Sequence, residues 1–399
     1  MIFNNFEHRI KTCKEKSFEF FNKINTDLGV KYTINHDIKK YPSAELYGTW
    51  SYVLGKSLIS SKEIFNDFEK ESLVKALKKF RQKDGTYYPE ILNNLKNSKS
   101  HEYLKLHTTN YAMGAMLKLD KNFDFQSTFF DQFLEADRLQ NWLDQRSFIR
   151  PWEESNNIVN VASYLALCDT NGDSKAKRRL YQMLDWHEKF RNSKSGGFDK
   201  LSLSKNHIIQ SMAGAVHNFH IYHYLGEKIN YEEIIAKNVI PHLFEGPLTA
   251  CLSIDFVELA CYTIGHLDTR NQLTLANALL FHLDSLLNYQ NNDGGWNENE
   301  TAQRPTTAAG MIEKNASSCS YATWFRLCSI AMISKTLLND NHNTWEFRSD
   351  LGMGYHSKKW TKLNISSADI KKSIHYKYQF KNIPSRIKKK CIEFASKII

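Results

Sequence analysis

Apolar helical segments with a polar opening recur along the chain, and no strand-like alternation of apolar and polar residues persists anywhere. Their spacing is roughly 50 residues, a period typical of stacked supersecondary units that bury their faces on one another. The segments begin near Leu46, His107, Asn156, Gln210, Ser253 and Ser320. Each follows a more polar, one-sided helix, most clearly at residues 64–80, 175–191 and 271–289. This alternation predicts an all-α fold, an (α/α)6 toroid of six helical hairpins with inner and outer rings.

Glycine-rich turns separate several of the predicted helices. They include Asp84-Gly85, Gly196-Gly197 and Gly294-Gly295. Glycine adopts the positive φ of a sharp helix exit, and an aromatic residue shortly after it can pack back between helices. We therefore predict one toroid domain over residues 1–345, which starts with an outer helix, and a C-terminal appendage over residues 346–399.

The net charge of +10 is concentrated at the C-terminus. Residues 371–399 contain nine Lys or Arg and one acid, Glu393, so this tail carries +8 and the first 370 residues carry +2. The pattern predicts a basic amphipathic helix over residues 384–399, suited to an anionic membrane surface. The alternative is a terminal helix that packs on its own domain. No extended basic stripe occurs elsewhere, so we expect no nucleic-acid partner.

Cysteine usage favours a reduced environment. The seven cysteines are scattered, none forms a Cys-x-x-Cys pair, and we expect no signal peptide before them. No apolar run reaches the length of about 18 residues that suggests a spanning helix. We therefore expect a cytoplasmic protein, with peripheral contact to the inner membrane face through the basic tail.

In an up-and-down ring, every inner helix starts at the same end, so the polar openings converge on one mouth. Positive helix dipole ends at that mouth favour anionic groups. The candidate substrate-contacting residues are Trp50, His107, Tyr111, Glu154, Asn156, His217, Tyr321, Trp324 and Arg326. Asn, Ser and Asp at helix starts are also good N-caps, so capping would explain a residue such as Asn156 equally well. Capping does not explain Trp50, Tyr111, Trp324 or Arg326.

The turn Gln290-Asn291-Asn292-Asp293-Gly294-Gly295-Trp296 resembles the QxxDGxW repeat of triterpene cyclases, and residues 81–85 form a degenerate copy. Upstream, Ser253-Ile254-Asp255-Phe256 stands where class II terpene cyclases carry Asp-x-Asp-Asp. The resemblance implies that Asp255 is the proton donor. Ser253 and Phe256 replace the flanking carboxylates of the family, and Glu258, one turn later on the same face, is the expected replacement partner.

Two further groups of toroids are similar to this chain. Protein prenyltransferase β subunits share the predicted fold and the approximate length, but their zinc ligands have no clear counterparts here. A divergent bacterial branch resembles it at Ile254-Asp255, Trp324-Phe325-Arg326 and Gly354-Tyr355-His356. The resemblance is loose over about 300 residues and close over about 45, and it predicts membership of the terpene cyclase and prenyltransferase superfamily of toroids.

Burial and a neighbouring carboxylate both raise the pKa of an acid, so one of Asp255 and Glu258 is predicted to stay protonated at neutral pH. Such an acid can protonate an alkene or epoxide, while the aromatic rings of Trp50, Tyr111, Trp324 and Phe219 stabilise cationic intermediates. An N-capping Asp with a helix-dipole Glu is the alternative.

The remaining candidates have two interpretations each. His217 and His220 share a helix face and could bind zinc with a third ligand, but cavity-lining histidines are favoured, and we predict neither metal nor cofactor. Arg326 is suited to a carboxylate, phosphate or diphosphate, or to a salt bridge between helices.

Three functions remain open. The first is a terpene-cyclase-like lyase or isomerase that protonates a prenyl or polyprenyl substrate in a central cavity. The second is a carbohydrate-active toroid (a glycosidase, an epimerase or a polysaccharide lyase) with Glu154 and Asp255 as an acid–base pair. The third is a non-catalytic toroid that binds a small-molecule or lipid-like ligand.

Overall fold

The computed structural model describes most of the chain between Ile2 and Ile370. The described ranges are 2–60, 64–94, 98–120, 122–199, 205–246, 248–298, 305–306, 311–312, 317–338, 345–357, 363–366 and 368–370. Helix makes up 67% of these residues and strand 4%, which confirms the all-helical prediction. The basic segment predicted over residues 384–399 lies outside the described residues.

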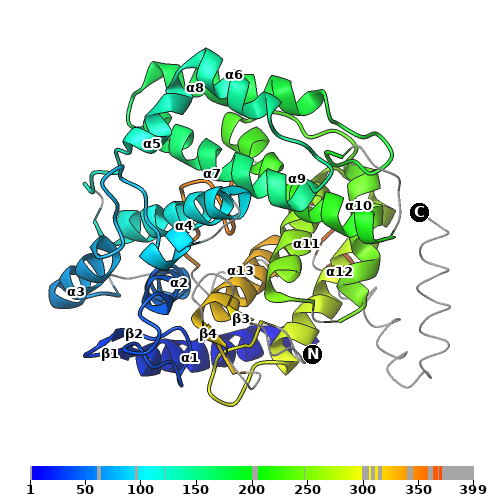
Figure 1. The fold of residues 1–399 in the computed structure, drawn as a ribbon. Coiled ribbons are helices and arrows are strands. Elements are labelled where there is room, and N and C mark those ends of the chain that lie inside the picture. The colour runs from blue at the N-terminus through cyan, green and yellow to red at the C-terminus, as the bar shows by residue number, and fades with distance from the viewer. Residues whose placement is uncertain are drawn as a thin grey trace.

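Six long helices contact one another in a closed cycle (Figure 1). They are α2 (Ala44–Leu58), α4 (Ser98–Leu119), α7 (Pro151–Thr170), α9 (Lys205–Leu225), α11 (Ala250–Thr263) and α13 (Ser320–Leu337). Each contacts the next in this order, and α13 contacts α2. All but three residues of α7 between Pro151 and Cys168 are buried, as are nearly all those of α11. Helices that are apolar all round must be enclosed by others, which is why these six form the inner layer.

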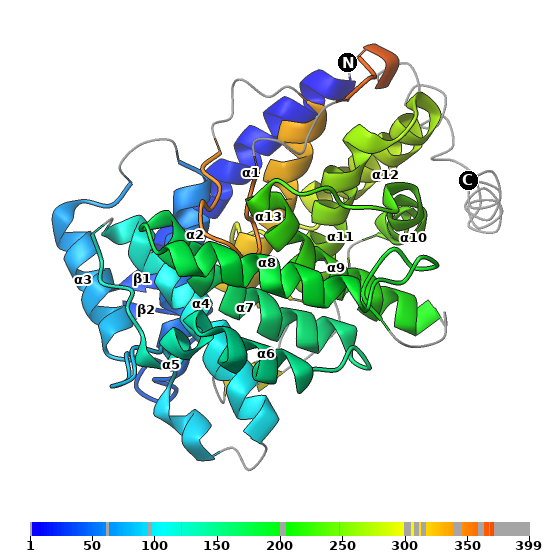
Figure 2. The same ribbon diagram turned by 90° about the horizontal axis from the view of Figure 1, so that it is seen from above.

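The other helices cover this inner layer (Figures 1 and 2). They are α1 (Ile2–Ile24), α3 (Asp67–Lys78), α5 (Thr128–Asp131), α6 (Ala136–Asp144), α8 (Ser174–Glu188), α10 (Glu232–Phe244) and α12 (Thr269–Asn288), with 3₁₀ turns η1 (Glu90–Asn94), η2 (Gln132–Leu134) and η3 (Ile264–His266). Most bury a single stripe: α3, for example, buries Leu73, Ala76 and Leu77. Two short antiparallel pairs, β1 (Asn25–Thr26) with β2 (Gly29–Val30) and β3 (Pro305–Thr306) with β4 (Met311–Ile312), complete the described elements.

The Gln290–Trp296 turn joins the first helix to the last two. The Gln290 amide donates to the Cys13 carbonyl at 3.0 Å, to Ser17 Oγ at 3.0 Å and to the Gly294 carbonyl at 2.9 Å. Gly294 has φ +95°, and a Cβ there would lie 2.0 Å from a carbonyl oxygen of α1, so only glycine fits. Trp296 is 1% exposed and donates to the Leu286 carbonyl at 3.0 Å. The motif therefore fastens α1 to α12 and α13.

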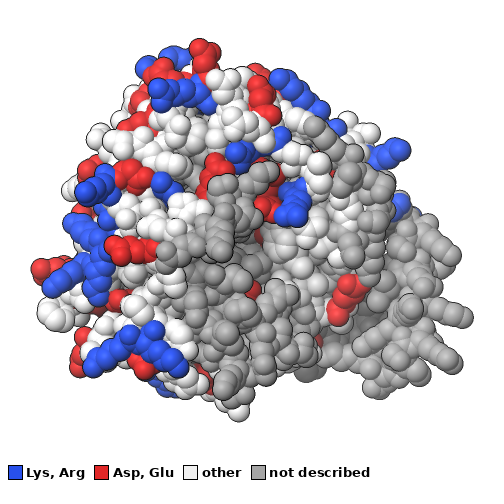
Figure 3. All heavy atoms as spheres, viewed as in Figure 1, with Lys and Arg blue, Asp and Glu red and all other residues white. Residues whose placement is uncertain are grey.

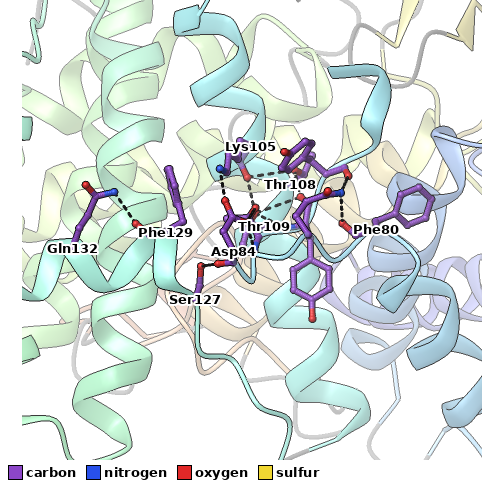
Figure 4. Close-up of polar contacts among 12 residues, drawn as sticks. Phe80, Asp84, Lys105, Thr108, Thr109, Ser127, Phe129 and Gln132 are labelled. Atoms are coloured by element: carbon purple, nitrogen blue, oxygen red, sulfur yellow. Dashed lines mark hydrogen bonds and ion pairs between the residues drawn. The ribbon is translucent and has the colours of Figure 1, made fainter. Parts of the chain in front are cut away.

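The turn around Asp84 plays a similar part between α3 and α4 (Figure 4). Lys105 of α4 donates to the Asp84 carboxylate at 2.7 Å, and Ser127 Oγ donates to the Asp84 carbonyl at 2.6 Å. Thr108 Oγ1 donates to the Tyr87 carbonyl at 2.5 Å. Side chains from α4 and from the segment before α5 thus bind this turn and hold it against α4.

A segment after α13, residues 345–357, returns into the ring and contacts all six inner helices. The Glu346 N–H donates to the Leu58 carbonyl of α2, and the Phe347 carbonyl accepts from Lys118 of α4. The Leu351 carbonyl accepts from Ser163 of α7, and the Tyr355 carbonyl accepts from Tyr262 of α11. The other contacts are with His220 of α9 and Cys328 of α13. The predicted boundary between residues 345 and 346 thus precedes a segment that is buried in the ring, which we name the floor segment.

The described surface carries charges of both signs. In the view of Figure 3, Lys and Arg side chains alternate with Asp and Glu side chains over the described part of the molecule. No described helix combines the length and the apolar character that crossing a membrane requires.

Candidate functional site

The candidate acid Asp255 lies inside its helix and does not cap it. The N-cap of α11 is Thr249, whose hydroxyl accepts from the Leu252 N–H at 3.3 Å. Asp255 follows more than one turn later and is 2% exposed. The helix begins before Ser253 because residues 250–252 continue its apolar pattern. The capping alternative for Asp255 is therefore wrong.

Asp255 faces His217 of α9. His217 Nε2 lies 3.9 Å from Asp255 Oδ1, which is too long for a hydrogen bond, and both side chains are almost fully buried. Asp255 Oδ2 and both ring nitrogens of His217 have no hydrogen-bond partner. Burial, and then the nearby Glu258 carboxyl, hold the pKa of Asp255 well above its ordinary value of 3.8. Both effects favour the protonated form of Asp255, and its Oδ2 has no hydrogen-bond partner.

Glu258 lies on the same face of α11, but it turns toward α9 and the floor segment. Its Oε2 lies 3.2 Å from His220 Nε2, and its Oε1 accepts from the Gly354 N–H at 3.0 Å. Burial raises the pKa of Glu258 well above 4.5, against the opposing effects of Gly354, Arg348 and Tyr262. Glu258 thus anchors the floor segment, and its proximity contributes to the raised pKa of Asp255.

Aromatic side chains from three inner helices contact one another and form an aromatic wall. Trp50 of α2 stacks on Tyr111 of α4 with ring centroids 4.7 Å apart. Tyr321 and Trp324 of α13 meet Trp50 edge-on at 5.7 and 5.8 Å. Tyr111, a member of this aromatic wall, also interacts electrostatically with Asp255. The structure brings four of the candidate residues, Trp50, Tyr111, Tyr321 and Trp324, into one aromatic cluster.

His107 joins the aromatic wall to the histidine side of the ring. It packs edge-on against Tyr111 at 4.7 Å and stacks on Tyr103 at 5.4 Å. Burial, with help from Arg348, lowers the pKa of His107 to about 4. Burial and the nearby His220 and His107 lower the pKa of His217 well below 6.5. Both imidazoles are therefore neutral at pH 7.

Other predicted residues have different partners. Glu154 lies 3.7 Å from Arg146, which also binds Glu102 at 3.1 Å. The Asn156 amide donates to the Trp152 carbonyl of its own helix at 2.9 Å. Arg326 Nη2 donates to the Leu248 carbonyl at 3.0 Å, and its Nε to the Asn297 carbonyl at 3.5 Å. The two Arg326 hydrogen bonds hold the loop before α11 and the loop after α12.

Phe219, predicted to stabilise cations, packs in a different aromatic group. Its ring centroid lies 5.6 Å from that of Phe198 and 5.9 Å from that of Tyr222, and Arg191 lies over its face at 4.7 Å. Phe219 therefore contributes to the packing between α9 and the segment that follows α8. Among the described residues, no group of three His, Cys, Asp or Glu side chains is arranged to hold a metal ion.

Sequence reasoning missed Arg348, which lies in the floor segment. Its guanidinium is 5.4 Å from the centre of the Tyr111 ring and donates to Asn110 Oδ1 at 3.1 Å. It also forms a buried ion pair with Asp350. The short spacing between Arg348 and Asp350 was visible in the sequence, but no periodic pattern placed this pair inside the ring.

These observations define a mostly helical protein with a buried acid, neutral imidazoles and an aromatic wall at the centre of a ring of helices. Comparison with known proteins found no matching family model, no matching curated protein and no matching solved structure.

Proposed function

We propose that this protein is an (α/α)6 toroid and a terpene-cyclase-like lyase or isomerase, in which Asp255 protonates a prenyl or polyprenyl substrate. The observation that carries the proposal is the free, buried oxygen of Asp255 beside an aromatic wall. The cyclic order of helix contacts supports the toroid. The Gln290–Trp296 turn, which fastens the first helix to the last pair, supports the likeness to triterpene cyclases.

The proposed reaction begins with proton transfer from Asp255 to a carbon–carbon double bond. The π electrons form the new C–H bond, and the adjacent carbon becomes a cation. Trp50, Tyr111 and Trp324 stabilise that cation through their π faces, an effect worth about 2 kcal/mol or more when water is excluded. The neutral His217 is placed to accept a proton from the product cation or to stabilise the Asp255 carboxylate.

The charge state of the acid suits this step. A protonated carboxyl is both uncharged and donating at pH 7, so an apolar substrate meets no buried charge before the reaction. Glu258 assists because its proximity raises the pKa of Asp255. Substitution of Asp255 by Asn keeps the shape and removes the transferable proton, so the fold should persist while turnover is lost.

The first test is native mass spectrometry of protein purified gently from its own host. A bound isoprenoid would support the proposal and would name the substrate for an assay of Asp255→Asn. A bound sugar or uronic acid would replace the proposal with the carbohydrate alternative. Full turnover by Asp255→Asn on the identified substrate would refute the role of Asp255.

The carbohydrate-active alternative has one observation in its favour. Asn157 Oδ1 and Asn160 Nδ2 of α7 are buried without hydrogen-bond partners, and amides of this kind commonly bind sugar hydroxyls. Against it, Glu154 is paired with Arg146, so the second carboxylate of the predicted acid–base pair has another partner.

We further propose that residues 384–399 dock on an anionic membrane surface, on the basis of their basic amphipathic sequence. Prenyl substrates reside in membranes, so such docking would bring the mouth of the ring near its substrate. A cytoplasmic location and peripheral contact with the inner membrane face follow from the same proposal. Co-sedimentation with anionic vesicles tests the docking.

A further inference from the structure

Five side chains of the inner helices α2, α4, α9 and α11 have buried polar atoms without partners. The atoms are Tyr47 Oη, Trp50 Nε1, His107 Nδ1, His217 Nδ1 and Nε2, and Asp255 Oδ2. Trp50 is 0% exposed, Asp255 2% and His217 3%. An unsatisfied buried donor or acceptor costs about 1–3 kcal/mol, so a cluster of them calls for a ligand that completes their hydrogen bonds.

These side chains belong to one site, because a chain of contacts joins them. Tyr47 and Trp50 lie 5.7 Å apart, and Trp50 stacks on Tyr111. Tyr111 meets His107, which interacts electrostatically with His217. His217 in turn faces Asp255. The residues come from α2, α4, α9 and α11, so the site spans the ring.

The hydrogen-bonding inventory is rich in donors. The indole of Trp50 only donates, and the protonated carboxyl of Asp255 donates through its hydrogen-bearing oxygen. A neutral imidazole has one donor and one acceptor nitrogen. Both nitrogens of His217 are without partners, and so is Nδ1 of His107. A matching ligand group must therefore accept several hydrogen bonds, as an oxygen atom does.

The guanidinium of Arg348, which lies over the Tyr111 ring beside this cluster, already has a counter-charge. It forms a buried ion pair with Asp350 through Nη2, while its Nε and Nη1 have no hydrogen-bond partner. His107 and His217 are neutral at pH 7, because their pKa values are lowered. An anionic group placed here would lose its hydration and would meet a guanidinium that Asp350 already neutralises, which is unfavourable.

We propose that the group bound between Trp50, His107 and Asp255 is an uncharged oxygen function, a hydroxyl, ether or carbonyl, and that phosphate and diphosphate groups are rejected. This inference rests on the proposed function for the prenyl part of the ligand. It narrows the substrate class to neutral oxygenated prenyl compounds, as distinct from prenyl diphosphates and from plain hydrocarbons.

The floor segment adds a constraint on direction. Gly354 binds Glu258, which lies one turn below Asp255 on α11, and Tyr355 and Arg348 fill the ring at that level. The floor segment therefore occupies the ring on that side of Asp255.

The test compares three fifteen-carbon probes that differ only in the end group: farnesol, farnesyl diphosphate and farnesene. Isothermal titration of the full-length protein gives a dissociation constant for each. We expect farnesol to bind at least tenfold more tightly than either of the others. Equal or tighter binding of farnesyl diphosphate, or of farnesene, would overturn the inference.

Two variants link the preference to this site. Trp50→Phe keeps an aromatic ring and removes the donor, and loss of one hydrogen bond should weaken farnesol binding about fivefold without changing farnesene binding. The control is Trp186→Phe in the outer helix α8, where Trp186 packs on Phe148 and Phe190, and it should change neither. Thermal unfolding verifies that each variant folds. If Trp50→Phe does not fold, His107→Phe replaces it as a variant that removes polar atoms from the same site.

A neutral sugar separates this inference from the proposed function. Binding of methyl glucoside that is weakened by Trp50→Phe, with no binding of any fifteen-carbon probe, would refute the prenyl substrate and keep the neutral oxygen site. Absence of binding by both farnesol and methyl glucoside would refute the oxygen site itself.

Discussion

Replacement of Arg348 by Met tests how far the floor segment holds the ring together. The Arg348–Asp350 pair has side chains only 3% and 4% exposed. Arg348→Met keeps most of the side-chain volume but leaves the Asp350 carboxylate buried without its counter-charge. Removing one partner of a buried pair typically costs about 3–5 kcal/mol. Loss of the bonds to Asn110 at 3.1 Å and to the Leu351 carbonyl at 3.3 Å belongs to the same change.

The assay measures the free energy of unfolding by urea denaturation at pH 7, with circular dichroism as the readout. The slope of the transition is compared between variants. The double variant Arg348→Met/Asp350→Asn removes the uncompensated charge, so it should recover more than half of the lost stability. Arg150→Met is the matched control, because the Arg150–Glu153 pair is exposed, at 79% and 37%. Such pairs contribute about 0–1 kcal/mol.

Two results would refute this reasoning. If Arg348→Met lost no more stability than Arg150→Met, the floor segment would not be fixed in the ring by this ion pair. If the double variant were as unstable as Arg348→Met, the buried charge would not be the cause of the loss.

Other predictions concern the acid, the ring closure and the tail. Because the pKa of Asp255 is raised above 3.8, the folded protein retains a proton that the unfolded chain releases, and stability falls as the pH rises above that value. Asp255→Asn removes this loss, so it should raise the unfolding midpoint at pH 7, with a difference that shrinks toward pH 4; an unchanged or lowered midpoint at pH 7 would contradict it. Gln290→Ala should cost about 1–3 kcal/mol, because it breaks bonds to α1, whereas Gln82→Ala, whose bonds stay within its own turn, should cost less in the same urea assay. Removal of residues 371–399 should abolish sedimentation with anionic vesicles and leave thermal unfolding unchanged; equal binding to neutral vesicles by the full chain would argue against an electrostatic tail.

The helices and their layers could be predicted because periodicity is a local property of the sequence. The segments beginning near Leu46 and Ser320 lie in α2 and α13, and the one-sided patterns at 175–191 and 271–289 correspond closely to α8 and α12. Helix starts were less predictable. The helix α4 begins at Ser98, well before the predicted start near His107. The prediction was late because polar residues in the first turns of the helix hide its apolar pattern.

The candidate site was predictable where it depended on burial. Asp255, Trp50 and Trp324 lie on all-round apolar helices, which must face the centre of the fold, so their enclosure follows from the sequence. Partnerships were not predictable in this way. The pairing of Glu154 with Arg146 and of Glu258 with Gly354 depends on which segments meet in space.

The sequence by itself therefore determined the helical class, the apolar inner helices and the enclosed acid, because each depends on the spacing of residues near one another. Only the tertiary structure decided that residues 345–357 return into the ring and that Arg348 lies over Tyr111. The segment has no helical period, and its place is set by hydrogen bonds and an ion pair formed with helices far away in the chain. Such contacts stabilise only when the ring has already brought their partners together and excluded water from them.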